Sequence, residues 1–339
     1  MLFDPRPKSS RRELFDRERE LEILDKAAER GEPLITVLGI RRIGKTSLLK
    51  SFLEEWTGLY IDMRGVRREL DLYERISEGL EEGLGKLRRL IEGIRGINIV
   101  GVEVEIKYRG KDSISLAGLL EELNKHGKRI VVVFDEAQLI RPPLSAEIKN
   151  AIAYAYDNLE NITVILSGSE IGLLKDFIGI DNPDSPLYGR YTLELPVKRF
   201  TRDLSIEFLR QGFREARIRV DEKIIEEAVE FFDGIVGWLV FFGKSYMDGT
   251  RDLGKIKEIA VQIAVRELQR LDWKAKTVLK AIAEGARTWT SIRRFIEEKK
   301  KTTIPKSTLT RAIKRLERLG IIKDYEFLDP IYMEAARKL

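Results

Sequence analysis

Short apolar runs alternate with amphipathic helical patterns over the first two hundred residues of the chain. The runs predict buried strands because they are rich in β-branched side chains and are bounded by turn residues. We place these strands at residues 34–38, 59–63, 130–134, 162–167 and 191–195. Strands that alternate with helices are typical of a parallel sheet with helices on both faces, so we predict an α/β domain over residues 1–197.

Residues 97–108 interrupt this pattern with apolar side chains at every second position. A period of two indicates strands with one buried face. We expect a small β-hairpin inserted between the second and third strands, at the margin of the sheet. The sequence assigns no function to this hairpin.

Helical patterns replace the strand patterns after Pro196. Residues 201–266 contain several amphipathic segments separated by breaks that carry glycine. We therefore predict a helical lid over residues 198–270.

Three further helices and two short strands are expected in residues 271–339. The third helix is predicted to begin with Ser307 as its N-cap, and Gly320 follows its end. Three helices followed by a hairpin is the order of a winged helix-turn-helix domain. The helices are expected at residues 274–283, 289–299 and 307–319.

A phosphate-binding motif follows the first strand, where residues 39–46 read GIRRIGKT and fit the pattern GxxxxGKT. Glycines let the backbone curl around phosphates, and the helix that follows presents its positive end to them. Lys45 is then expected to reach the β- and γ-phosphates of a nucleoside triphosphate, and Thr46 to ligate Mg²⁺. The strand before the motif and the helix after it argue against a chance glycine-rich turn. The nucleotide-binding residues we expect here are Gly39, Arg42, Ile43, Gly44, Lys45, Thr46 and Ser47.

The strand at residues 130–134 ends in two carboxylates, Asp135 and Glu136, which is the form of a Walker B segment. Asp135 is expected to hold Mg²⁺ through water beside Thr46, and Glu136 to polarise the attacking water. The alternative is a buried strand capped by two solvated acids. The pairing with the phosphate loop favours the functional interpretation and indicates that hydrolysis accompanies binding.

Three residues near the ends of later strands are candidates for sensing the γ-phosphate. In phosphate-loop ATPases with an extra strand between the two Walker strands, a polar residue at the tip of that strand has this role. Ser167 and Ser169 fit it, although a plain strand-to-loop turn has the same sequence. Arg190 is a candidate phosphate ligand in its own subunit or in a neighbouring one, with a surface ion pair as the alternative. The guanine-reading pattern NKxD is absent, because Gly127 stands where its aspartate belongs.

Composition narrows the class of protein. The 339 residues are 43% apolar, without a run long enough to span a membrane, so we expect a cytoplasmic protein. Zero cysteines and one histidine exclude disulfides and thiolate or histidine metal sites, which leaves oxygen ligands of the kind that Mg²⁺ prefers. The 35% charged content resembles that of proteins from thermophiles.

Positive charge is concentrated in residues 272–339, which carry 17 Lys and Arg against 9 Asp and Glu. The basic excess predicts double-stranded DNA as a partner. In the third helix of the predicted winged-helix domain, the apolar positions face the core. This leaves Thr308, Arg311, Lys314, Arg315 and Arg318 facing outward, where they are expected to enter the major groove of DNA. Lys306 and the run 299–301 are expected to contact phosphates. The alternative is that the domain binds a protein rather than DNA. The acidic residues 324, 326 and 329 argue against a wing that contacts the DNA phosphates.

Five segments together resemble the archaeal ATPases of the AAA+ type. More narrowly, they are similar to the signal-transduction ATPases with numerous domains. The likeness extends over nearly the whole chain, since that family also carries a helical lid and a winged helix. The segments are residues 15–21, 39–49, 134–138, 167–169 and 186–190.

The resemblance implies roles for further residues. Arg17 and Glu18 match the family's N-terminal element, which lies against adenine and ribose, although Asp16 stands where that element has glycine. The family's lid often contacts the nucleotide through Gly-x-Pro, which residues 234–238 lack, so Trp238 is interpreted as a buried core residue.

The function that the sequence predicts is that of a slow, Mg²⁺-dependent ATPase. It alternates between ATP and ADP and couples the bound nucleotide to the winged helix. The alternatives are a DNA-binding ATPase similar to replication initiators and an ATP-bound scaffold for a protein partner with little turnover. The oligomeric state stays open.

Overall fold

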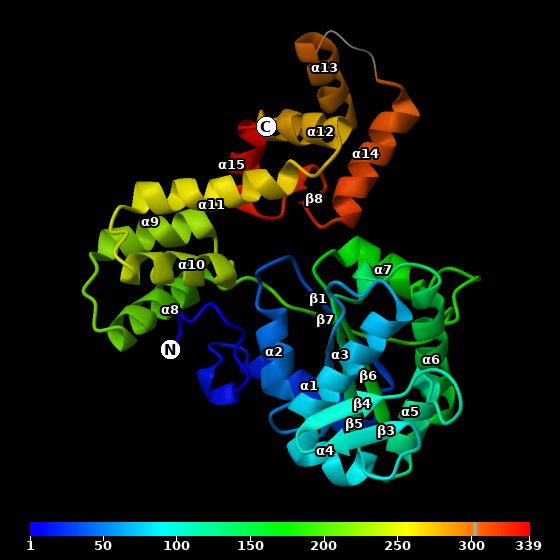
Figure 1. The fold of residues 1–339 in the computed structure, drawn as a ribbon. Helices are drawn as coiled ribbons and strands as arrows, with labels where there is room; N and C mark the ends of the chain where they lie inside the picture. The colour runs from blue at the N-terminus through cyan, green and yellow to red at the C-terminus, as the bar shows by residue number, and fades with distance from the viewer. Residues whose placement is uncertain (301–303) are drawn as a thin grey trace.

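The computed structural model describes residues 1–300 and 304–339. Along the chain it contains an α/β core, a group of four helices and a small C-terminal unit that lies above the core (Figure 1). The phosphate contact expected of Lys301 lies outside the described residues.

The core contains a five-stranded parallel sheet in the order β2-β5-β6-β1-β7. Strand β6 lies between β1 and β5, which are the strands before the phosphate loop and the acidic pair. The predicted α/β fold with an extra strand between the two Walker strands is therefore confirmed. The strands are β1 Leu34–Leu38, β2 Gly58–Asp62, β5 Ile130–Asp135, β6 Ile162–Gly168 and β7 Leu193–Pro196.

Helices cover both faces of this sheet. Successive residues of β5 point to opposite faces, so Val131 and Val133 pack against α1 and α2, whereas Val132 and Phe134 belong to the core on the other face. The continuous apolar runs are thus a consequence of burial on both sides. Helices α1 and α2 span Glu18–Arg30 and Lys45–Phe52. The remaining α-helices of the core are α3 Glu69–Glu82, α4 Leu84–Ile91, α5 Leu116–Asn124, α6 Leu144–Asn158 and α7 Ile171–Ile178. Two short 3₁₀ helices are η1 Arg11–Glu13 and η2 Ala137–Leu139.

The expected hairpin forms a separate two-stranded antiparallel sheet of β3 Ile97–Val100 and β4 Glu103–Ile106. It lies beside α3 at the edge of the core (Figure 1). Val104 and Ile106 are buried, whereas Val100 and Val102 at the turn are exposed.

The lid consists of α8 Arg202–Glu215, α9 Glu222–Phe232, α10 Val236–Met247 and α11 Leu253–Leu268. Thr201, Asp221 and Asp252 cap three of these helices by accepting hydrogen bonds from first-turn N–H groups. The lid and the C-terminal unit share one continuous hydrophobic core, with α11 packed along α15 Pro330–Arg337. The domain boundaries drawn from the sequence stay a prediction.

The C-terminal unit has the predicted winged-helix order. Its elements are α12 Trp273–Ala283, α13 Trp289–Lys300, α14 Lys306–Arg318, β8 Ile322–Lys323 and β9 Glu326–Phe327. The expectation that Ser307 caps α14 is wrong, because the helix begins one residue earlier and Pro305 precedes it. A further helix, α15, was not predicted. Its N-cap Asp329 accepts from the Ile331 N–H at 2.8 Å, and Pro330 occupies the first helical position.

Candidate active site

The phosphate loop connects β1 to α2 and encloses Lys45, whose side chain is 5% exposed. Its Nζ donates to the carbonyl oxygens of Gly39 at 2.8 Å and Ile40 at 3.2 Å. Burial lowers the pKa of Lys45, whereas the charges of Glu136 and Asp135 oppose this shift. Gly44 has a φ of 96°, which only glycine adopts without strain.

Thr46 and Asp135 meet as the sequence predicts, with Thr46 Oγ1 donating to Asp135 Oδ2 at 2.7 Å. The Tyr60 hydroxyl donates to the same oxygen, and Ser167 Oγ donates to Oδ1. Burial, the Asp135 charge and this hydrogen bond raise the pKa of Tyr60, so it stays a donor. A hydroxyl beside a carboxylate supplies the oxygen ligands that suit Mg²⁺.

The carboxylate of Glu136 is held on one oxygen. Its backbone is left-handed, with a φ of 57°, and Oε2 accepts hydrogen bonds from Gln138 Nε2 at 2.6 Å and from Ser169 Oγ at 2.8 Å. The Ser169 N–H donates to the same oxygen at 3.2 Å. The two serines considered as phosphate sensors thus contact the two acids, Ser167 on Asp135 and Ser169 on Glu136. A part for either in sensing phosphate stays a prediction.

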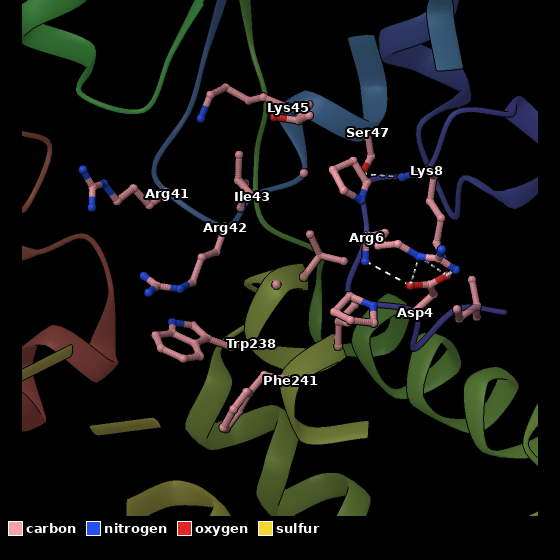
Figure 2. A pocket seen from close by; sticks show the side chains of 18 of the residues that line it. Asp4, Arg6, Lys8, Arg41, Arg42, Ile43, Lys45, Ser47, Trp238 and Phe241 are labelled. Carbon is pink, nitrogen blue, oxygen red and sulfur yellow. Dashed lines mark hydrogen bonds and ion pairs between the residues drawn. The ribbon is translucent and has the colours of Figure 1, made fainter. Parts of the chain in front are cut away.

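A cavity of about 870 Å³ extends from the phosphate loop to the lid. Its volume is in the range of small-molecule sites. Glu136 and Ser169 are among the residues that line it. Phe241 lines it from the lid (Figure 2). The cavity therefore brings the phosphate loop, Glu136 and apolar side chains of the lid into one space.

An N-terminal segment that the sequence analysis missed forms another wall of this cavity. Residues 1–8 cross from the lid to α2: Phe3 is fully buried in the lid, and the Lys8 N–H donates to Ser47 Oγ at 3.1 Å (Figure 2). The ring of Phe3 fits there because Gly212 and Gly243 face it without side chains. The segment carries no helical or strand pattern that would have marked it.

Arg17 is a buried residue of the cavity wall. Its Nη2 donates to Ile43 O at 3.3 Å and to Lys198 O at 2.9 Å, and its guanidinium lies 4.8 Å from the centre of the Phe200 ring. It therefore braces the phosphate loop against the start of the lid, and it also lines the cavity. Glu18 is exposed at the start of α1. Their contact with adenine and ribose stays a prediction.

Arg42 points away from the phosphate cradle and into the lid (Figure 2). Its guanidinium lies 4.1 Å from the ring centre of Trp238, which is 2% exposed, and pairs with Glu267 of α11. The Tyr332 hydroxyl of α15 donates to the same carboxylate. Trp238 Nε1 in turn donates to buried Asp329 at 2.9 Å. Residues of the phosphate loop, the lid and the winged helix thus meet in one polar network.

Arg190 is not brought to this cavity. Its Nη2 lies 2.6 Å from Asp157 Oδ2 at the end of α6, and its guanidinium lies over the Tyr156 ring. It precedes β7, and because the sheet is parallel, this end of β7 is opposite the end that carries the phosphate loop. A contact with phosphate in the same subunit gains no support, and one in a neighbouring subunit stays untested.

The basic helix α14 is only partly free. Arg318 pairs with Asp176 of α7, and Arg315 pairs with Asp272. The closeness to α7 depends on Gly172, where an added Cβ would lie 2.5 Å from Arg318 Cα. The other candidate DNA contacts lie closer to the start of α14 than Arg315 and Arg318 do. Lys306, Arg311 and Lys314 are exposed, and Thr308 is partly buried.

Residues 14–242 match a family of ATPase domains found predominantly in Archaea. The chain belongs to this archaeal ATPase family. The Walker-type ATPase of Pyrococcus abyssi, a solved structure, is 36% identical, covers 99% of this chain and 100% of its own, and superposes with a TM-score of 0.83. An uncharacterized ATP-binding protein of Pyrococcus horikoshii is 26% identical over 247 residues, which are 67% of this chain and 73% of that protein.

The C-terminal part of this ATPase matches a second family over residues 273–328, the C-terminal winged helix-turn-helix domain of MCM proteins. Cdc6p of Pyrobaculum aerophilum shares the fold at 17% identity, with a TM-score of 0.50 over 99% of this chain and 96% of that one. The resemblance to archaeal AAA+ ATPases with a winged helix is confirmed. The narrower likeness to signal-transduction ATPases stays a prediction. Among the described residues, no helix combines the length and apolar character that a membrane span needs.

Proposed function

We propose that this ATPase hydrolyses ATP slowly in a Mg²⁺-dependent reaction and acts as a switch that couples the bound nucleotide to the winged helix. The enclosed Lys45 supports the binding of β- and γ-phosphates, because its ammonium already lies within the cradle. Thr46 and Asp135 would hold Mg²⁺, which neutralises charge that develops on the phosphates. Glu136 would orient the attacking water and accept its proton.

The coupling rests on one observation, the network through Glu267. This carboxylate of α11 accepts from Arg42 in the phosphate loop and from Tyr332 in the winged helix. A nucleotide that changes the conformation of the loop would change the position of Arg42. The lid and the winged helix would then respond, because each is tied to the loop through the same carboxylate.

Rates of ATP hydrolysis in Mg²⁺ test the catalytic part of this proposal. We expect Lys45→Ala to lose tight ATP binding, and Glu136→Gln to bind ATP but turn it over at least 100-fold more slowly, on the scale of a lost general base. Lys26→Ala is the matched control, because Lys26 is exposed on α1 and forms an ion pair with exposed Glu22. Unchanged hydrolysis in both site variants would remove the proposal.

We also propose that α14 binds duplex DNA, as the exposed Lys306, Arg311 and Lys314 favour. Affinity for duplex DNA should fall steeply with salt, and replacing both Arg311 and Lys314 by alanine should weaken it and flatten the salt response. Lys338→Ala, near the chain end, is the control. A flat salt response in the wild type would exclude DNA and favour a protein partner. ATP retained through purification with negligible turnover would instead favour a scaffold.

A further inference from the structure

Gln138 is a buried polar residue beside Glu136, and one of its two amide atoms is unpaired. It lies in η2, is 2% exposed, and donates from Nε2 to Glu136 Oε2. Its amide oxygen Oε1 is buried without a hydrogen-bond partner. Burial of an unpaired amide oxygen destabilises a fold, so a side chain of this kind calls for a reason other than stability.

The neighbouring strand makes room for this amide. A Cβ on Gly168, the last residue of β6, would lie 2.3 Å from Gln138 Oε1 and 3.1 Å from its Cδ. Any side chain at residue 168 would therefore displace the amide from Glu136. The backbone of β6 and the side chain of Gln138 thus pack closely against each other beside Glu136.

Three donors converge on a single oxygen of Glu136. Gln138 Nε2, Ser169 Oγ and the Ser169 N–H all donate to Oε2, and no described residue donates to Oε1. The left-handed backbone of Glu136 fixes the base of the side chain. The carboxylate is thus restrained at both ends, with one oxygen left available.

We propose that Gln138 is a positioning residue for ATP hydrolysis, which holds Oε2 of Glu136 so that Oε1 can take the proton of the attacking water. This inference rests on the proposed function. Water gives its proton to Oε1, its oxygen forms a bond to the γ-phosphorus, and the bond from that phosphorus to the bridging oxygen breaks to leave ADP. Gln138 itself does not line the cavity, so it acts through Glu136.

Gln138→Met tests this role, because methionine has a similar size and no donor. We expect kcat to fall roughly tenfold to 100-fold, as for a displaced catalytic group, while the Kd for ATP stays within about twofold, because Gln138 does not line the cavity. Thr163→Val is the control: Thr163 is also buried with an unpaired hydroxyl, but it lies earlier in β6. Ser169→Ala, which removes one donor with little change of volume, should lower kcat in the same direction if Gln138→Met folds poorly.

A double variant separates positioning from a structural role. In a Glu136→Gln background, Gln138→Met should cause no further loss of kcat, because its effect passes through Glu136. A wild-type kcat in both Gln138→Met and Ser169→Ala would overturn the inference, as would a loss that adds fully to that of Glu136→Gln. In these cases Glu136→Gln alone would still be slow and the proposed function would stand. If Glu136→Gln hydrolyses ATP normally, both proposals fall.

Discussion

Replacing Glu267 by glutamine tests the link between the phosphate loop and the winged helix. The variant keeps the shape of the side chain, but it removes the charge that pairs with Arg42 and replaces one of the two oxygens that accept from Arg42 and Tyr332 by an NH₂ donor. Loss of one partner costs about 3–5 kcal/mol in a fully buried pair and about 1 kcal/mol or less at the surface. The Arg42 and Glu267 side chains are 22% and 23% exposed, so we expect an intermediate loss of about 2 kcal/mol.

The loss should depend on pH. Burial alone would raise the pKa of Glu267, but the hydrogen bonds from Arg42 and Tyr332 and the charge of Arg42 outweigh it, and the pKa is lowered from its ordinary value of 4.5. A carboxyl group whose pKa is depressed by folding stabilises the protein above its unfolded value and loses this effect as the pH falls through the folded value. The difference between wild type and Glu267→Gln should therefore be full at neutral pH and shrink below pH 4.5.

Urea unfolding at pH 7 measures the free-energy change, and duplex DNA affinity with and without ATP measures the coupling. We expect the wild type to bind DNA differently in the two nucleotide states, and Glu267→Gln to bind alike in both. Glu258→Gln is the matched control, because Glu258 is an exposed residue of the same helix. The proposed coupling would be refuted if Glu267→Gln unfolded like this control and kept the wild-type response to ATP.

Two further predictions concern other contacts of the site. Tyr60→Phe should raise the Mg²⁺ concentration for half-maximal hydrolysis about tenfold, because Asp135 loses an orienting donor; a titration with Mg²⁺ measures this, and an unchanged midpoint would contradict it. Gly172→Leu should separate α14 from α7, since a side chain there meets Arg318, and should strengthen duplex DNA binding. Fluorescence anisotropy with labelled duplex measures the affinity. If Gly172→Leu bound duplex DNA with the wild-type affinity, the contact between α14 and α7 would not restrict DNA binding.

The parts of the site that lie in contiguous motifs were predictable from the sequence. The phosphate loop and the acids at 135 and 136 follow strands with continuous apolar runs, so pattern and spacing were sufficient to place them. The hydrogen bond from Tyr60 to Asp135 was not predictable. It depends on the register of β2 against β5, which sets Tyr60 beside Val133, two residues before Asp135. Gln138 lies within the segment 134–138 that carries the family resemblance, but its proposed role depends on the backbone turn at Glu136 and on Gly168.

Contacts between distant parts of the chain were also beyond local patterns. Arg42 and Glu267 are 225 residues apart in sequence, and Tyr332 lies another 65 residues on. No periodicity links them, because they meet only where three folded units pack together. Helix α15 has a recognisable start signal in Asp329 and Pro330, so this helix is predictable from the sequence.

The shared core of the lid and the winged helix has a mechanical consequence. Since α11 packs along α15, the two units would turn as one body around the segment that joins β7 to α8. With 16 residues, α11 is about 24 Å long and would act as a lever arm in such a rotation. A rotation that shifts Trp238 only slightly against Arg42 would move Lys306, at the first turn of α14, through a much wider arc.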